Sequence, residues 1–364
     1  MKREQLLEAI GGVEEGLLVE SDKTTRRSVH GIGRIALIAA VVAALAITVM
    51  ASTGIITGFL SAGENGSSVS NLSTGMGTFV YSDDAIYYGA PGYIYKYDVN
   101  GKLLKTYPLS DRYETPVYMF ATEDAIVYVN IMGVAVEPED ENDPGRAYNW
   151  GLRVQPKDGS APQTVYPEIS ATNAYVDETM LYNTNGGEML TRIDLQTMQK
   201  EELLENVNQY FVDDTYIYAV QGGKEKCYFR SLKDEVNFEK FSLTFDPNKV
   251  IADGDTLYIC QWIEEEDREE GQLPYQVNQV QDGVTTPLPI YTWFYQVLDG
   301  CILYRDDSYK LKSYDLDTGK TETLQKNVFD FSVMDGRYIC IERFNKAPVV
   351  LDWTTGETVK LPIG

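Results

Sequence analysis

Acidic residues recur at one place in a repeated sequence pattern. Seven segments combine an apolar run, an acidic turn and a second apolar run, as FVYSDDAIYY does between Phe79 and Tyr88. The acidic positions are Asp83, Glu123, Asp177, Asp213, Asp253, Asp299 and Asp335. A ring of such carboxylates at the mouth of a channel would attract a cation. However, tight hairpin turns favour Asp-Gly and Asp-Asp pairs, and calcium needs about 6–8 converging oxygens. The turn explanation is therefore favoured, and no metal site is predicted.

Three aromatic residues, Tyr148, Trp150 and Trp262, lie where the repeat is interrupted. The first two fall in an insertion at 132–151, and the third falls in an insertion at 262–274. Both insertions come between the second and third strands expected for their repeat units, so both should project from one face. Inserted loops on one face of a repeat scaffold commonly carry binding. We therefore predict an interaction face at these three residues, with packing across the loop base as the alternative.

The chain lacks the usual signatures of an enzyme or a cofactor site. It has no GxSxG, HExxH or phosphate-binding glycine loop, and its one histidine is His30. No catalytic, cofactor-binding or metal-binding residue is predicted, and a non-enzymatic role is favoured. Asp/Glu pairs that hydrolyse glycosides stay open as the alternative, because acidic residues are abundant. The net charge of −24 argues against binding to nucleic acid, which needs clusters of Lys and Arg.

The elements that would hold these residues are short strands in a unit that repeats about every 40 residues. The first hairpins of the units end at Tyr88, Tyr128, Tyr182, Tyr218, Tyr258, Tyr304 and Cys340. A third strand follows, as in YIYKYDV at 93–99, and then a turn such as NGK and a fourth strand. Four short strands per unit at this period are typical of β-propeller blades. The sequence predicts an all-β fold, a seven-bladed β-propeller of four-stranded antiparallel blades. Six blades are the alternative if the first or last unit is degenerate.

The N-terminal part differs in composition from the repeats. Residues 1–34 are predicted to form a cytoplasmic tail with short amphipathic helices, and 61–76 a flexible Ser/Gly linker to the propeller at 77–364. Residues 35–60 contain no charged side chain and exceed the roughly 20 residues that a transmembrane helix needs. Basic residues precede this span and an acidic residue follows it. This predicts a single-pass cell-membrane protein with a cytoplasmic N-terminus and an extracytoplasmic propeller. A cleaved signal peptide is the alternative.

Two stretches resemble known families. The opening QLLEAIGGVEEGLLVE, with the basic patch and apolar span after it, is similar to the N-terminus of clostridial single-pass membrane proteins, several of them described as anti-sigma-factor-like. Units such as DDAIYYGAPGYIYKYDVNGK resemble a Firmicutes domain of unknown function related to the low-density-lipoprotein-receptor type of β-propeller. The YWTD tetrapeptide of the receptor family is replaced here by AIYY, TLYI or ILYR. The resemblance therefore implies the fold and not the ligand.

Together these features predict a membrane-anchored extracytoplasmic propeller that binds a protein, a peptide or a glycan and senses its presence. Its second contact is with the lipid bilayer, through residues 35–60. A cell-surface enzyme that acts on glycans through Asp/Glu pairs is the alternative function, and a structural spacer without a ligand is a third. No cofactor is expected.

Overall fold

The computed structural model describes residues 78–362 apart from 136–145, 167–172, 178–179, 185–187, 196, 222–224 and 269–271. The predicted tail, membrane helix and linker lie outside the described residues. Within the described part of the chain, no helix is long and apolar enough to cross a membrane. The one helix found there is the single 3₁₀ turn η1 (Glu265–Asp267), and strands make up the rest of the regular structure.

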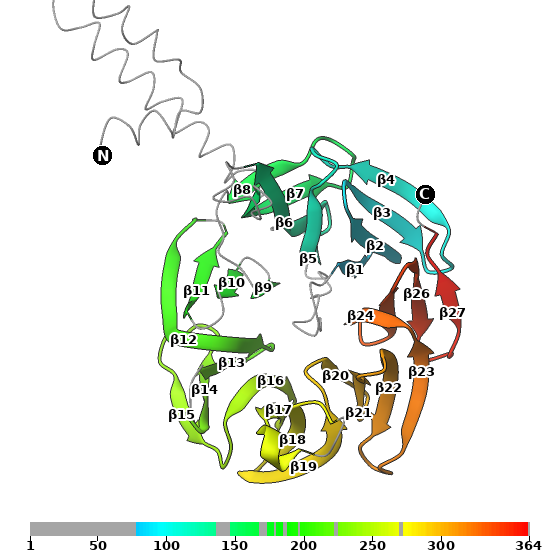
Figure 1. Cartoon of the computed structure of the whole chain (residues 1–364). Helices are drawn as coiled ribbons and strands as arrows, with labels where there is room; N and C mark the ends of the chain where they lie inside the picture. The colour runs from blue at the N-terminus through cyan, green and yellow to red at the C-terminus, as the bar shows by residue number, and fades with distance from the viewer. Residues whose placement is uncertain are drawn as a thin grey trace, which may run out of the picture. The chain divides into compact units, whose positions relative to one another are not determined.

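Strands in the described residues form six antiparallel sheets, and strands that are consecutive in the chain are neighbours in each sheet (Figure 1). The first sheet contains β1 (Phe79–Ser82), β2 (Ala85–Ala90), β3 (Tyr93–Asp98) and β4 (Leu103–Pro108). The second contains β5 (Thr115–Ala121), β6 (Ala125–Ala135), β7 (Arg146–Pro156) and β8 (Gln163–Tyr166). The third is larger and contains β9 (Asn173–Asp177), β10 (Met180–Thr184), β11 (Glu188–Asp194), β12 (Lys200–Val212), β13 (Tyr216–Gln221), β14 (Cys227–Leu232) and β15 (Glu239–Ser242).

The remaining three sheets again have four strands each among the described residues. The fourth sheet contains β16 (Pro247–Asp253), β17 (Thr256–Trp262), β18 (Tyr275–Gln281) and β19 (Val284–Tyr291). The fifth contains β20 (Tyr295–Leu298), β21 (Cys301–Arg305), β22 (Lys310–Asp315) and β23 (Thr321–Lys326). The sixth contains β24 (Val328–Met334), β25 (Tyr338–Arg343), β26 (Lys346–Asp352) and β27 (Thr358–Lys360). The predicted all-β fold built from four-stranded antiparallel units is confirmed.

The third sheet is continuous because β12 pairs with two different neighbours along its length. Residues Lys200 to Leu204 pair with β11, whereas Gln209 to Val212 pair with β13. Val207 lies between these two parts and has a partner on both sides. The sheet therefore consists of a β9–β12 part and a β12–β15 part that share one long strand.

Apolar side chains pack the sheets against one another in chain order. One core cluster joins Tyr218 of β13, Ile259 of β17 and Ile302 of β21, so it connects the third, fourth and fifth sheets. Another cluster joins Phe79 of β1 to Cys340 of β25 and packs the sixth sheet against the first. Burial of each large apolar side chain in these clusters contributes about 1.5–3 kcal/mol. Figure 1 shows the result, a succession of sheets around a common centre.

The predicted acidic turns are confirmed in the first hairpin and need correction in the fourth sheet. Asp83 and Asp84 form a two-residue turn between β1 and β2, and each has a φ of 52°. This left-handed conformation is the one that two-residue hairpins require. Asp253, in contrast, is the last residue of β16 and has a strand partner, so Gly254 and Asp255 form the turn. The acidic residue thus has no single structural position in the repeat.

The predicted insertions differ in how far they leave the sheets. The prediction of a loop over 132–151 is wrong in its extent, because β6 continues to Ala135 and β7 begins at Arg146. The two strands, each of 11 residues, continue their pairing into the insertion, and this pairing satisfies their backbone N–H and C=O groups. Residues 136–145 lie outside the described residues. The second insertion is confirmed as a connection, because β17 ends at Trp262 and β18 begins at Tyr275.

Lys249 of β16 is an exception to the apolar interior, since its side chain is 3% exposed. Its Nζ lies 3.3 Å from the Trp293 carbonyl oxygen and 3.5 Å from that of Tyr295. It also lies 4.8 Å from the centre of the Tyr295 ring. Burial lowers the pKa of Lys249 to about 8, because the ammonium loses its water shell. The charged form of this side chain therefore destabilises the folded state at neutral pH.

Candidate functional site

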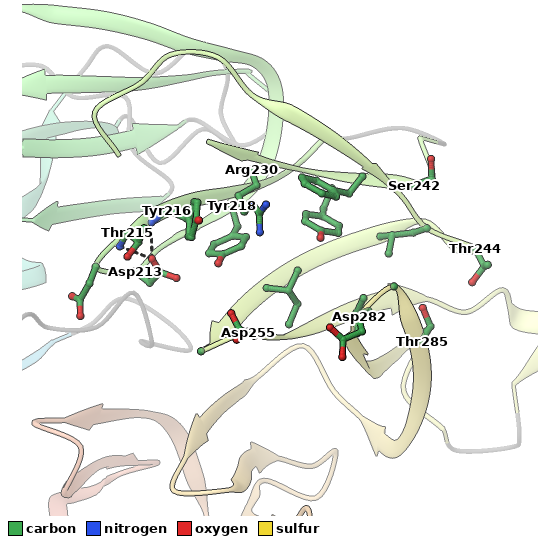
Figure 2. Close-up of a pocket in the computed structure, with 18 residues that line it drawn as sticks. Asp213, Thr215, Tyr216, Tyr218, Arg230, Ser242, Thr244, Asp255, Asp282 and Thr285 are labelled. Carbon is green, nitrogen blue, oxygen red and sulfur yellow. Dashed lines mark hydrogen bonds between the residues drawn. The ribbon is translucent and has the colours of Figure 1, made fainter. Parts of the chain in front are cut away.

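A cleft with a volume of about 830 Å³ lies between the third and fourth sheets (Figure 2). The wall from the third sheet contains Tyr216, Tyr218, Tyr228, Arg230 and Phe241. The wall from the fourth sheet contains Gly254, Asp255, Leu257, Val280, Asp282 and Thr285. Figure 2 shows Tyr216, Tyr218 and Arg230 along one side of the cleft, with Asp255, Asp282 and Thr285 across from them. The volume lies in the range of about 300–1,000 Å³ that is usual for ligand sites.

Strand alternation places the aromatic residues of β13 on the cleft side of the third sheet. Successive side chains of a strand point to opposite faces, so Tyr216 and Tyr218 share one face of β13. Ile217 and Ala219 take the other face and are buried in a cluster formed within the third sheet. The sequence YIYAVQ thus anchors β13 on one side and leaves a row of phenol rings toward the fourth sheet.

A stack of aromatic rings and one guanidinium forms the wall from the third sheet. Tyr228 and Phe241 are cross-strand partners whose rings are nearly parallel, at 8°, with centres 4.9 Å apart. The guanidinium carbon of Arg230 lies 4.8 Å from the Phe241 ring centre and 4.7 Å from that of Tyr216. Cation–π attraction contributes about 0.5–1 kcal/mol at exposed sites and more where water is excluded. The wall is therefore preformed, and several of its ring faces are already covered.

The Asp213 carboxylate shapes the turn at the end of this wall. Its Oδ1 accepts hydrogen bonds from the backbone N–H groups of Thr215 (2.7 Å) and Tyr216 (2.6 Å). These two bonds fix the turn that leads into β13. Burial, together with the nearby Asp213 carboxylate, raises the pKa of Tyr218 far above its ordinary value. Burial likewise raises the pKa of Tyr228. Both phenols therefore keep their protons at neutral pH. The Tyr218 hydroxyl is hydrogen-bonded to the Asp213 carboxylate, whereas the Tyr228 hydroxyl can donate to a ligand.

The cleft has a negative charge balance. Its described lining contains four carboxylates, from Asp213, Asp214, Asp255 and Asp282, and one guanidinium, from Arg230. Arg230 is already near Glu239, with 3.8 Å between Nη2 and Oε2, although the exposure of this pair makes it weak. Asp214, Asp255 and Asp282 are exposed at the rim. The site therefore favours ligands that carry positive charge or many hydrogen-bond donors.

The three aromatic residues predicted from the sequence lie away from this cleft. Trp262 is the last residue of β17 and is 43% exposed, and its ring meets the Tyr275 ring at 80° with centres 5.1 Å apart. It therefore both packs at the loop base and remains accessible. Tyr148 and Trp150 belong to β7, where they pair with Gly133 and Ile131, and their side chains lie outside the described part of the structure. The predicted interaction face as a whole stays a prediction.

Sequence reasoning did not find the cleft residues, above all Tyr216 and Arg230. The segment YFVDDTYIY looks like every other copy of the repeat, and CYFRSL reads as an ordinary strand. The available signal was the alternation of aromatic and basic residues on one face of neighbouring strands. The width of the gap between two sheets has no counterpart in local sequence.

No protein-family model and no curated protein matches this sequence. Solved structures are similar in fold at low sequence identity. One is the tricorn protease, with 10% identity and a TM-score of 0.54. The match covers 81% of this chain and 35% of the tricorn protease chain. Hsv2p of Kluyveromyces lactis matches with 8% identity and a TM-score of 0.51 over 79% of this chain and 100% of that one. PorZ is a bacterial surface component of the type-IX secretion system of Porphyromonas gingivalis. It matches with 12% identity and a TM-score of 0.51 over 80% of this chain and 38% of the PorZ chain.

The likeness is to β-propeller proteins, and it shows that fold alone. This chain spans about a third of the tricorn protease chain, so the larger protein's activity does not transfer. The predicted β-propeller is thereby confirmed as a fold. Function has to come from the side chains of the cleft and of the surface.

Proposed function

We propose that this protein is a membrane-anchored, extracytoplasmic β-propeller that binds a segment of a polypeptide in the cleft between its third and fourth sheets. The observation that carries the proposal is the cleft itself. One wall is the stack of Tyr216, Arg230, Phe241 and Tyr228 side chains, and the rim carries carboxylates. Tyrosine and arginine anchors in a preformed hollow are typical of protein-binding hot spots.

The chemistry of the cleft favours a basic polypeptide over a sugar. A sugar ring needs an open aromatic face, yet Arg230 covers Tyr216 and lies with Tyr228 on the Phe241 ring. A polypeptide needs donors for its carbonyl groups and acceptors for its N–H groups. The Tyr228 phenol and the Arg230 guanidinium supply the donors, and the rim carboxylates accept from N–H groups and from Lys or Arg side chains.

The membrane placement and the blade count belong to the same proposal. The uncharged span at 35–60 supports a single anchor, and the charges around it support a cytoplasmic N-terminus. The short tail before the span would then report binding to the cytoplasm. Counting the two parts of the third sheet separately gives seven four-stranded units among the described strands, which supports seven blades.

A selection from random dodecapeptides tests the binding function. The full chain in detergent micelles is presented to an mRNA-displayed library, and enriched peptides are measured by fluorescence anisotropy. We expect enriched peptides to carry Lys or Arg and to lose about tenfold in affinity with Tyr216→Ala, since removal of an interface anchor costs on the order of 1–2 kcal/mol. The control Tyr113→Ala removes an aromatic side chain that is 50% exposed and lies outside the cleft.

Two results would count against the proposal. Either no peptide is enriched, or the enriched peptides bind the Tyr216→Ala protein as tightly as the parent. The glycan-active enzyme is tested with the same preparation by measuring reducing ends released from a polysaccharide panel. Sustained release would replace the binding function with the enzymatic one.

A further inference from the structure

A second hollow lies at the opposite end of β17 from the cleft. It has a volume of about 400 Å³, and its lining includes Gln261, Trp262, Glu264, Asp267, Gln276 and Tyr291. The cleft adjoins the turn before β17, whereas this hollow begins at its last residues. Leu257 of the cleft and Gln261 of the hollow are four residues apart on β17, which is about 13 Å at about 3.3 Å per residue, and no described residue lines both. The two hollows are therefore distinct sites.

Fixed amide groups line part of this hollow. Gln261 Nε2 donates to Gln276 Oε1 at 3.0 Å, and Gln276 Nε2 lies 3.3 Å from both the Tyr291 hydroxyl and the Leu288 carbonyl oxygen. Gln276 is thus held by three partners. Among the described residues, these bonds leave the side-chain amide oxygen (Oε1) of Gln261 and the hydroxyl proton of Tyr291 without an assigned partner. An acceptor and a donor in fixed positions are therefore offered to a ligand.

Two carboxylates flank η1 and line the hollow together. Glu264 precedes η1 and Asp267 is its last residue, three positions later. Glu264 has extended backbone before the turn, and both residues line the hollow. Both residues are exposed, and no described residue forms an ion pair or a side-chain hydrogen bond with either carboxylate. They add acceptors that prefer hydroxyl or N–H donors.

Trp262 supplies a broad apolar surface at the same place. Its ring is held at 80° to the Tyr275 ring, and the residue is still 43% exposed. The guanidinium carbon of Arg268 lies 6.0 Å from the Trp262 ring centre, at the limit of cation–π range. A cation of the chain itself therefore already adjoins the ring and competes with a second cation for it. An exposed tryptophan face also binds the C–H-rich face of a sugar ring, since the π face is negative and those C–H bonds are weakly positive.

We propose that this hollow binds one or two units of an uncharged sugar chain. The carboxylates and the Gln261 oxygen accept from sugar hydroxyls, the Tyr291 hydroxyl donates to a sugar oxygen, and Trp262 lies against the ring. Glu264 and Asp267 repel uronic and phosphorylated sugars. The volume of about 400 Å³ suits a ligand of this size. The ligand class and the site both differ from those of the cleft.

Titration with defined trisaccharides tests this site. The full chain in detergent micelles is titrated with cellotriose, mannotriose, N-acetylchitotriose and trigalacturonate, and binding is followed by calorimetry and tryptophan fluorescence. We expect at least one of the three uncharged sugars to bind saturably and the charged trigalacturonate not to bind.

Variants assign the binding to the hollow. Trp262→Ala should weaken binding about tenfold, whereas Trp262→Phe keeps an aromatic face and should retain most of it. The combined change Glu264→Gln and Asp267→Asn should weaken binding about threefold, because charge-assisted hydrogen bonds become neutral ones. Tyr113→Ala serves as the exposed aromatic control and should change nothing. Tyr216→Ala in the cleft should also leave sugar binding unchanged, which separates this proposal from the peptide-binding function.

Three outcomes would overturn the proposal. None of the uncharged sugars binds, or trigalacturonate binds equally well, or the Trp262→Ala protein binds like the parent. An octapeptide of alternating Gly and Arg is included as a fourth probe. If it binds in a Trp262-dependent way and the sugars do not, the hollow accepts a cationic side chain and the sugar assignment is wrong.

Discussion

Replacement of the buried Lys249 by methionine should stabilise the protein, and by an amount that depends on pH. Burial lowers the pKa of Lys249 from 10.5 to about 8. At 1.36 kcal/mol per pKa unit, this shift corresponds to a destabilisation of about 3 kcal/mol at pH 7. Methionine fills similar space but loses the contacts to the carbonyl oxygens of Trp293 and Tyr295, which costs about 1 kcal/mol. We expect a net gain of about 2 kcal/mol for Lys249→Met at pH 7.

The pH dependence is the sharper part of this prediction. Between about pH 8 and 10.5 the unfolded chain binds the lysine proton more strongly than the folded chain, so the stability of the parent protein rises with pH over that window. The Lys249→Met protein lacks this pH dependence. The difference in unfolding free energy between it and the parent protein should therefore shrink by about 2 kcal/mol between pH 7 and pH 9.5. Urea denaturation followed by tryptophan fluorescence measures both proteins, and tyrosine ionisation affects them alike. Two stability curves that stay parallel across this range would show that the pKa of Lys249 is not lowered.

Three further predictions test the packing of the sheets. Glu114→Ala should lower the free energy of unfolding, measured by urea denaturation, by about 3–5 kcal/mol. The fully buried Glu114 carboxylate lies 3.0 Å from the Arg153 guanidinium, which would lose its ion-pair partner. Glu225→Ala breaks an exposed ion pair with Lys240 and should have little effect. Gly89→Ala should lower the unfolding free energy by about 1–3 kcal/mol, since the new Cβ would lie 2.9 Å from the Pro116 carbonyl oxygen. Cys301 is the one partly exposed thiol of the four and should react first with a thiol reagent, and simultaneous labelling of all four would contradict the described burial.

Much of the fold could be predicted because the local sequence of each repeat unit is enough to indicate its strands and turns. Alternating apolar residues and acidic turns mark the strands, and a turn such as Asp83-Asp84 closes a hairpin without help from the rest of the chain. Sharing of β12 between two parts of the third sheet could not be predicted in this way. It depends on Val207, which pairs with Glu188 of β11 and with Gln221 of β13, so that the last strand of one unit continues into the first strand of the next without a break. The extension of β6 and β7 escaped prediction for a similar reason, because an insertion can lengthen a hairpin as well as form a loop.

The candidate sites divide along the same physical line. Trp262 could be found because it stands where the repeat is interrupted, and an interruption is visible in the sequence. Tyr216 and Arg230 stand in an ordinary copy of the repeat, and their importance comes from the space between two sheets. That space lies between the third and fourth sheets and depends on how the two sheets pack, not on either segment alone. In a repeat protein, an insertion that interrupts the repeat is therefore easier to find from sequence than a cleft between two sheets.

Aspartate residues with positive φ in two-residue turns can serve the fold, and one of them also lies at the cleft. Asp282 has a φ of 51° in the β18–β19 turn and also lies at the rim of the cleft, whereas Asp299 has a φ of 47° in the β20–β21 turn away from it. Asparagine tolerates this backbone conformation as well as aspartate does, so Asp→Asn removes the charge and keeps the turn. Asp282→Asn should leave the urea midpoint unchanged and weaken the binding of basic peptides, and Asp299→Asn should change neither. An equal loss of binding in both variants would mean that the carboxylates act through the overall negative field of the protein and not through contact in the cleft.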